Sequence, residues 1–307
     1  MSFALSTSWN AFRYSSGKEL LFEIKGLGVS KIELSFNIIP AMLKDIERAV
    51  RNGEIEVTSL HNFCPIPDGL KREEALPDCY SISSLNEEER QEAVKYAKRS
   101  IDTAQLLEAR AVVLHCGRVE VPDRTRDLIG FYEKGLRDSP EFESLKNDMI
   151  RERESLSPAF LRQAIKSLKE LDSYAIKKVV ALGVETRFYH REIPSFKEVG
   201  AILGLFKSSS IYYWHDTGHA QLMENLGFAA HREYLEQYSG RMIGIHLHDI
   251  SGCRDHQAPP KGGIDFRMIK QYTRKETIKV LEIHHPATAE EIKNSIKYLA
   301  DTFNDLA

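Results

Sequence analysis

The chain has 307 residues, of which 42% are hydrophobic and 28% are charged, and its formal net charge is −3. This composition is typical of a globular protein with an ample core. The slight negative charge excludes a protein-wide basic field that would attract nucleic acid or anionic lipid. The start MSFALSTSWN is unlike a signal peptide, no apolar run reaches membrane-spanning length, and the 4 cysteines show no CxxC spacing. We therefore expect a cytoplasmic protein with reduced thiols.

Short apolar runs alternate with amphipathic helical patterns along the whole chain. The runs predicted to be strands are residues 3–9, 29–35, 55–61, 111–115, 179–185, 211–215, 242–248 and 278–283. Strands that alternate with helices favour a parallel sheet, and this number of strands favours a closed (β/α)8 TIM barrel, one α/β domain over residues 1–307. An open doubly wound sheet is the second possibility, but no glycine-rich turn follows the first strand as a dinucleotide site would require.

Three helices have recognisable starts. The signals are a capping box of Asn86 and Glu89, an N-cap Ser157 with a first-turn Pro158, and a cap of Thr288 and Glu291.

Two connections are long. Residues 64–85 are rich in Pro and Asp, and residues 118–156 separate the fourth strand from its helix. Both follow the carboxyl ends of strands, where barrels build active sites, so a pocket wall and a subunit contact are both open interpretations.

Ionisable residues collect where the predicted strands end. They are His61, His115, Glu185, Asp216 with His219, His246, His248 and Glu282. Asp216 could simply cap a helix, with His219 as a solvated neighbour. Buried charges at the mouth of an apolar barrel are costly unless they are paired or bound to metal. Four of these side chains, Glu185, Asp216, His246 and Glu282, could therefore converge on one divalent cation, the alternative being separately hydrogen-bonded polar groups.

Other candidates are less specific. His246 and His248 share a strand face, so spacing cannot say which one is the ligand. Glu33 and Trp9, near the ends of the first two strands, could line the pocket, although core packing is the more common role for such residues. The polar loop after the seventh strand holds Arg254, Asp255 and His256, which could reach over the site.

The pattern resembles the xylose isomerase-like TIM barrels, a superfamily of sugar isomerases and epimerases that also contains endonuclease IV. The resemblance rests on SLHNFCP, VLHCG, VETR, HDTGHA, HLHD, RDHQAPPKGG and LEIH, in this order on successive strands. It implies one divalent metal (Mn, Zn, Mg, Co or Fe) held by Glu185, Asp216, His246 and Glu282. His246 is preferred because the family motif reads H-x-x-D. It also implies that Glu185 and Glu282 form the acid/base pair and that His219 and Arg254 contact the substrate.

The nuclease branch of this superfamily implies a different site. Endonuclease IV binds three zinc ions, and its further ligands would fall here on His61, His115 and His219. Its Asp-x-His motif is not matched, because Asp255 and His256 are adjacent. The insertion of residues 118–156 holds eight Lys/Arg and ten Asp/Glu and is not a basic arm for DNA. This charge balance favours a small-molecule enzyme.

The function that we predict is therefore a sugar or sugar-phosphate isomerase or epimerase that transfers a proton through a metal-bound cis-enediolate. Glu185 and Glu282 are the expected catalytic residues. The expected substrate contacts are His219, Arg254, His115, His61 and His248. Nucleic acid and membrane are unlikely partners, and a homo-oligomer is possible. The alternatives are a dehydratase or lyase of the same chemistry, an endonuclease IV-like zinc phosphodiesterase acting on abasic DNA, and a barrel that only binds a ligand.

Overall fold

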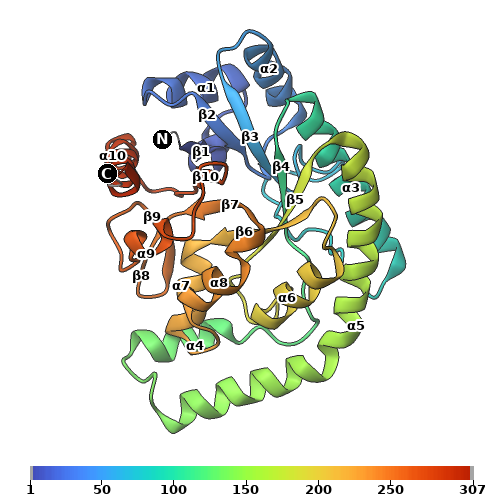
Figure 1. The fold of residues 1–307 in the computed structure, drawn as a ribbon, viewed down its shortest axis with the longest axis vertical. Coiled ribbons are helices and arrows are strands. Elements are labelled where there is room, and N and C mark those ends of the chain that lie inside the picture. Colours follow the sequence, from blue (N-terminus) through green and yellow to red (C-terminus); the bar gives the residue numbers. More distant parts are fainter. Residues whose placement is uncertain (1–2, 305–307) are drawn as a thin grey trace.

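The computed structural model describes residues 3–304, and in this range eight parallel strands close into a barrel (Figure 1). The barrel strands are β1 (Ala4–Ser6), β2 (Lys31–Leu34), β3 (Glu56–His61), β4 (Ala111–Leu114), β5 (Ala181–Glu185), β6 (Ile211–Asp216), β7 (Met242–Leu247) and β10 (Ile278–Leu281). Their order around the barrel is β1-β10-β7-β6-β5-β4-β3-β2. The predicted TIM barrel is confirmed, and each of its strands falls within or overlaps a predicted run.

Helices cover the outside of the barrel. They are α1 (Gly17–Gly26), α2 (Pro40–Arg51), α3 (Glu87–Leu106), α4 (Thr125–Glu133), α5 (Pro140–Lys178), α6 (Phe196–Leu205), α7 (Thr217–Asn225), α8 (His231–Tyr238), α9 (Phe266–Lys270) and α10 (Ala289–Asn304). A short antiparallel hairpin of β8 (Asp249–Ser251) and β9 (Arg254–Gln257) follows β7. No helix in residues 3–304 combines the length and apolar character needed to cross a membrane.

Trp214 fills the inside of the barrel below the ends of β5, β6 and β7. Its side chain is fully buried, and glycines stand beside it on both neighbouring strands, Gly183 on β5 and Gly244 on β7. A Cβ atom at Gly183 would lie 2.8 Å from the indole, and one at Gly244 would lie 2.1 Å from it. Because side chains alternate along a strand, Asp216 points to the same side of the sheet as Trp214. The indole therefore forms a packed support for the polar residues at the strand ends.

Two of the three predicted helix starts are at the expected residues. Asn86 caps α3 by accepting hydrogen bonds from the backbone N–H groups of Glu88 and Glu89. The Glu89 side chain does not complete the capping box, because it accepts bonds from Ser81 and Ser84 instead. At α10 the box is complete, with reciprocal bonds between Thr288 and Glu291.

The predicted start at Ser157 and Pro158 is wrong. Helix α5 runs without interruption from Pro140 to Lys178, and Pro158 lies inside it. The true start has the same signal one segment earlier, where the Ser139 side chain accepts a bond from the Phe142 N–H and Pro140 occupies the first turn. Local sequence could not choose between the two Ser-Pro pairs, because an interior proline is tolerated where the rest of the helix is held by packing.

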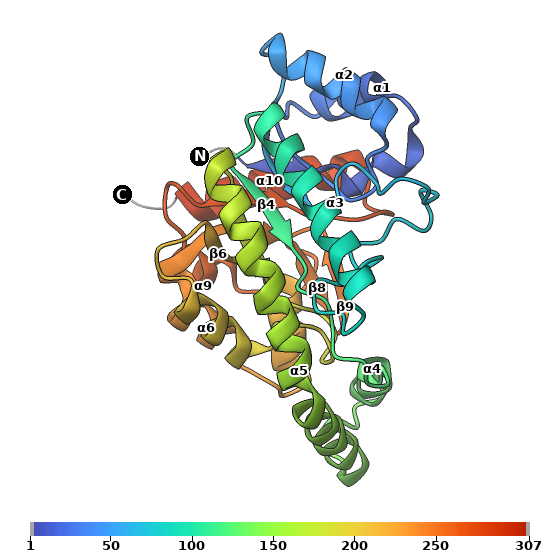
Figure 2. The same ribbon diagram turned by 90° about the vertical axis from the view of Figure 1, so that its right-hand side faces the viewer.

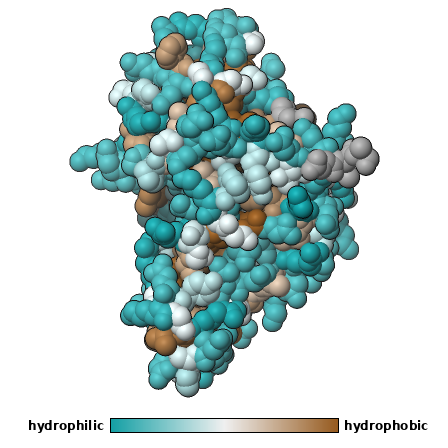
Figure 3. All heavy atoms as spheres, turned by 90° about the vertical axis from the view of Figure 1, so that its left-hand side faces the viewer, coloured by the Kyte–Doolittle hydropathy of each residue, from teal (hydrophilic) through white to brown (hydrophobic). Residues whose placement is uncertain are grey.

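The two long connections lie at the carboxyl end of the barrel. Figure 2 shows α4 and the first half of α5 beyond the end toward which β4 points, while the second half of α5 runs beside α3. The face seen in Figure 3 is mainly hydrophilic, with apolar side chains scattered over it. The segments that differ most from a plain barrel are thus at the end where the polar residues collect.

Val179 gives a test of the end of α5. Val179 was predicted to begin the fifth strand, but it follows the last residue of α5 and precedes β5. Its backbone has the left-handed conformation (φ 58°, ψ 38°), and its side chain is 89% exposed. A β-branched residue is strained there, whereas glycine is not. We expect Val179→Gly to raise the free energy of unfolding by about 1 kcal/mol in denaturant titrations. Lys178→Gly, one residue earlier within the helix, should lower it by a similar amount, and equal destabilisation by both would contradict this view of the cap.

Candidate metal centre

Three carboxylates and one imidazole meet at the end of the barrel. Glu185 and Asp216 are the last residues of β5 and β6, His246 lies near the end of β7, and Glu282 directly follows β10. All four side chains are buried. One donor atom from each lies within 4.8 Å of the others. The structure therefore brings together the four residues that the strand ends suggested.

His246 lies at the centre of this cluster. Its Nδ1 is 2.7 Å from Glu185 Oε1, 3.0 Å from Glu282 Oε2 and 3.6 Å from Asp216 Oδ2. Its Nε2 is 3.0 Å from Glu33 Oε1 on β2, and Glu33 also accepts a hydrogen bond from Ser59. If a cation took the place of the proton on Nδ1, a proton on Nε2 donated to Glu33 would leave the Nδ1 lone pair directed at the three carboxylates. This is the tautomer that a metal-ligating histidine needs.

The three carboxylates are ionised in spite of their burial. Burial raises the pKa of Glu185, but hydrogen bonds from His115 and His246 outweigh it and hold the pKa well below the usual range. Burial likewise raises the pKa of Asp216, and the charges of His219 and His248 reverse the shift. For Glu282 the opposing charge is mainly that of His246. Ionised carboxylates in one buried place need a compensating cation, and this set of oxygen and nitrogen donors fits a divalent metal.

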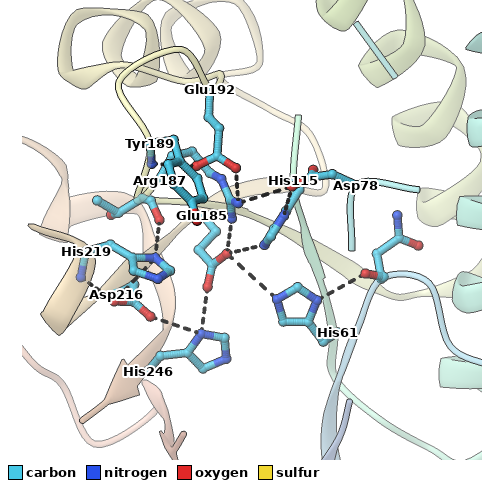
Figure 4. A network of polar contacts seen from close by, with 12 residues as sticks. His61, Asp78, His115, Glu185, Arg187, Tyr189, Glu192, Asp216, His219 and His246 are labelled. Carbon is cyan, nitrogen blue, oxygen red and sulfur yellow. Dashed lines mark hydrogen bonds and ion pairs between the residues drawn. The ribbon is translucent and has the colours of Figure 1, made fainter. Parts of the chain in front are cut away.

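Glu185 is also bound from the side away from His246 (Figure 4). Its Oε2 accepts a hydrogen bond of 2.6 Å from Arg187 and lies 2.8 Å from His115 Nε2. Arg187 also donates to Glu192 (2.8 Å), and the other ring nitrogen of His115 is 3.1 Å from Asp78. Burial and the Arg187 charge lower the pKa of His115, but Asp78 and Glu185 overcome them and raise it to about 9. Two cationic groups therefore stand behind Glu185.

Asp216 combines the two roles that the sequence left open. It caps α7 by accepting a hydrogen bond of 2.7 Å from the backbone N–H of His219, and it belongs to the four-residue cluster. His248 Nε2 is 2.9 Å from its Oδ1, while His248 Nδ1 accepts a bond from the His256 N–H. His248 does not line the cavity, so the structure places it behind Asp216 rather than facing a substrate.

A cavity of about 900 Å³ opens above the cluster. Its lining includes most of the side chains that the sequence suggested as substrate contacts, namely His61, His115, His219 and Arg254. His256 also lines it, stacked between the rings of His248 and His284 at centroid distances of 4.2 and 3.7 Å. The two long connections contribute Asp78 and Arg126 among other residues, so both form walls of this cavity. Trp9 is not in the lining and packs in the core.

Sequence reasoning missed several residues of the site. Arg187 and His284 each lie two positions after a predicted ligand, so the two-residue period of a strand could have pointed to them. For Glu33 the sequence favours core packing, but its carboxylate contacts His246. Asp78 lies in an irregular connection and Glu192 in the segment after β5. No local pattern indicates that either one points toward Glu185.

Residues 21–302 match the model of the xylose isomerase-like TIM barrel family. The chain belongs to this family. Solved structures with the same fold include an L-ribulose 3-epimerase (16% identity, TM-score 0.68, covering 99% of this chain and 95% of that one) and a 3-keto-D-glucoside 4-epimerase from E. coli (14%, 0.67, 98% and 99%). A third is an IolI protein with a bound zinc atom (15%, 0.67, 99% and 98%). No curated protein matches the chain significantly in sequence.

Glu33 provides a test of the metal centre that does not need an activity. Glu33→Gln removes the charge that fixes the His246 tautomer, and partners of this kind typically contribute 10–100-fold in metal affinity. We expect a loss of about this size for Mn²⁺ and Zn²⁺ in calorimetric titrations of the chelator-treated protein. Glu54→Gln, which changes an exposed glutamate paired with Lys25, is the matched control. Unchanged affinity in Glu33→Gln would contradict the proposed tautomer.

Proposed function

We propose that this protein is a divalent-metal-dependent isomerase or epimerase of a sugar or sugar phosphate. The observation that carries the proposal is the set of three ionised carboxylates around His246 Nδ1 at the bottom of a large cavity. Family membership supports it, as do the fold neighbours named as sugar epimerases. When bound by Glu185, Asp216, His246 and Glu282, a divalent cation supplies Lewis-acid stabilisation of charge on a substrate oxygen.

We assign the proton transfer to Glu282 and Glu185. They come from β10 and β5, which flank β7 and β6 in the barrel, and so approach the cluster from opposite sides. One carboxylate removes the proton from the carbon next to the substrate carbonyl, the C–H electrons form the C=C bond, and the carbonyl oxygen becomes an enediolate oxygen. In an isomerase the same carboxyl group returns its proton to the former carbonyl carbon. In an epimerase the second glutamate must carry a proton of its own when the substrate is bound, and it gives that proton to the other face of the same carbon.

The two glutamates have different surroundings, and on this basis we assign them different tasks. Arg187 and His115 donate to Glu185 Oε2, so Glu185 holds a proton weakly and returns it readily. Glu282 lies near two imidazoles, with His246 at 3.0 Å and His256 at 3.7 Å, and we assign the uptake of the substrate proton to it. His219 lines the cavity above Asp216 and is placed to stabilise charge on a substrate oxygen.

Proton exchange tests these roles. In D₂O, the wild-type protein loaded with Mn²⁺ should exchange the carbon-bound hydrogen of its substrate, as measured by NMR on a panel of ketoses. Glu282→Gln and Glu185→Gln should each lower the exchange rate by about 10²–10⁴-fold, because each removes a proton carrier. Metal content is measured on every variant, and Glu54→Gln is the control. Full exchange in either variant with its metal intact would overturn that residue's role.

A specific observation keeps a second function open, that of a multinuclear phosphodiesterase. Three further groups among the described residues could each hold a metal and share a carboxylate with the main cluster. The first is His61, His115 and Glu185, the second is Asp216, His219, His248 and His256, and the third is His256, Glu282 and His284. Arg187 argues against the first, because its guanidinium already occupies Glu185 Oε2 and places a positive charge where a second cation would lie. We therefore propose a single metal per chain.

Metal counting decides between these functions. Elemental analysis of the zinc-loaded wild-type protein should give one metal per chain, and Arg187→Ala should bind an additional ion because Glu185 Oε2 becomes free. Arg51→Ala, on α2, is the control. Three metals in the wild-type protein, together with cleavage of duplex DNA at abasic sites, would overturn the isomerase proposal.

A further inference from the structure

The cavity has a rim that is built by two segments lying side by side. Residues that follow β4 and residues that follow β5 form an antiparallel bridge between Arg118 and Glu192. The Val119 N–H donates to the Arg191 carbonyl (2.8 Å), and the His190 N–H donates to the Thr125 hydroxyl (3.1 Å). These bonds bring three arginines, Arg118, Arg126 and Arg191, to one side of the cavity, and all three line it.

The charges of these arginines are poorly compensated. Arg126 is exposed, and its guanidinium meets the Tyr189 hydroxyl at 2.8 Å but no carboxylate among the described residues. Arg191 has its nearest carboxylate oxygen, on Asp123, at 3.7 Å, and its Nε is buried without a partner. Arg118 pairs with the exposed Glu120 at 3.2 Å. Guanidinium groups in this state offer free donors to an anion.

The carboxylates of the same cavity are arranged differently. Those at the bottom are bound to imidazoles or to Arg187, as described above, and they are buried or half-buried. Glu133 of α4 also lines the cavity. The cavity is thus acidic at its bottom and basic at its rim. Because like charges repel, an anionic substituent would avoid the ionised Glu185, Asp216 and Glu282 and lie toward the arginines.

The size of the cavity fits a substrate that reaches both places. Small-molecule sites span roughly 300–1,000 Å³, and this one, at about 900 Å³, is near the upper end. The rim is also connected to the proposed catalytic groups. The Arg126 guanidinium donates to the Tyr189 hydroxyl. The Tyr189 N–H donates to Glu192, and Glu192 accepts from Arg187, which holds Glu185 (Figure 4).

We propose that Arg126 and Arg191, with Arg118 beside them, form an anion subsite that binds the phosphate group of a phosphorylated sugar while the carbonyl end of the sugar lies at the metal centre. This inference rests on the proposed function and narrows its substrate class from sugars and sugar phosphates to sugar phosphates. Arginine suits the task because its planar fork can donate two parallel hydrogen bonds to phosphate oxygens.

Binding of three sugars that differ only at carbon 6 tests the subsite. They are D-fructose, D-fructose 6-phosphate and D-fructuronate, with inorganic phosphate as a fourth probe, titrated calorimetrically into the Mn²⁺-loaded protein. The phosphate ester should bind the wild-type protein roughly 10- to 100-fold more tightly than fructose. This gain in affinity corresponds to the free energy that hydrogen bonds to charged groups usually contribute. The double variant Arg126→Gln/Arg191→Gln should lose most of this difference and keep its affinity for fructose. Arg51→Gln should keep both affinities.

Several outcomes would overturn the subsite. They are equal binding of fructose and its phosphate, a phosphate preference that survives in the double variant, and a larger gain for fructuronate than for the phosphate ester. Arginine-dependent binding of an abasic DNA duplex in place of the sugar phosphate would do the same. Inorganic phosphate that binds wild-type protein more tightly than the double variant supports the subsite without any sugar.

The two proposals fail in different ways. Arginine-dependent binding of the phosphate ester without proton exchange in any sugar would leave the subsite standing and remove the proposed reaction. Proton exchange in fructose, with no gain from the phosphate, would leave the reaction standing and remove the subsite.

Discussion

The site depends on keeping three carboxylates ionised in one buried place. Glu185, Asp216 and Glu282 all face His246 Nδ1, and none of them could remain charged there without opposing cations. The rest of the strand-end architecture serves this arrangement. Trp214 fills the barrel below the cluster, Asp216 is anchored as the cap of α7, and Glu33 orients His246 from the opposite side. A metal centre of this kind is a property of the closed barrel, since its ligands come from different strands.

The cations around Glu185 support the proposal of a single metal per chain. Arg187 and His115 both contact Glu185 Oε2, and Asp78 and Glu192 hold them there. A guanidinium provides fixed positive charge without an open coordination position, so it neutralises a carboxylate but cannot activate water as a metal does.

The long connections provide what the barrel strands cannot. Strand ends can place a few buried side chains near the axis, but they leave the outer part of the cavity open. Residues 64–85 bring Asp78 to His115, and residues 118–126 bring Arg118 and Arg126 to the rim. The result is a cavity with a negative bottom and a positive rim. Such a separation of charge gives a substrate one preferred orientation before any chemistry begins.

The sequence by itself determined the barrel and the four residues that converge at its end. Apolar runs that alternate with helix patterns can be read from local periodicity. Ionisable residues at the end of a buried strand point to a site, because burying a charge is costly unless it is paired or bound to metal. Tertiary structure alone decided the start of α5, because packing overrides a local Ser-Pro signal. It also decided the neighbours of these residues. Glu33 contacts His246, Arg187 contacts Glu185, and Asp78 contacts His115. The first and last of these contacts join residues that are distant in the chain, and only closure of the barrel and the paths of its long connections bring them together.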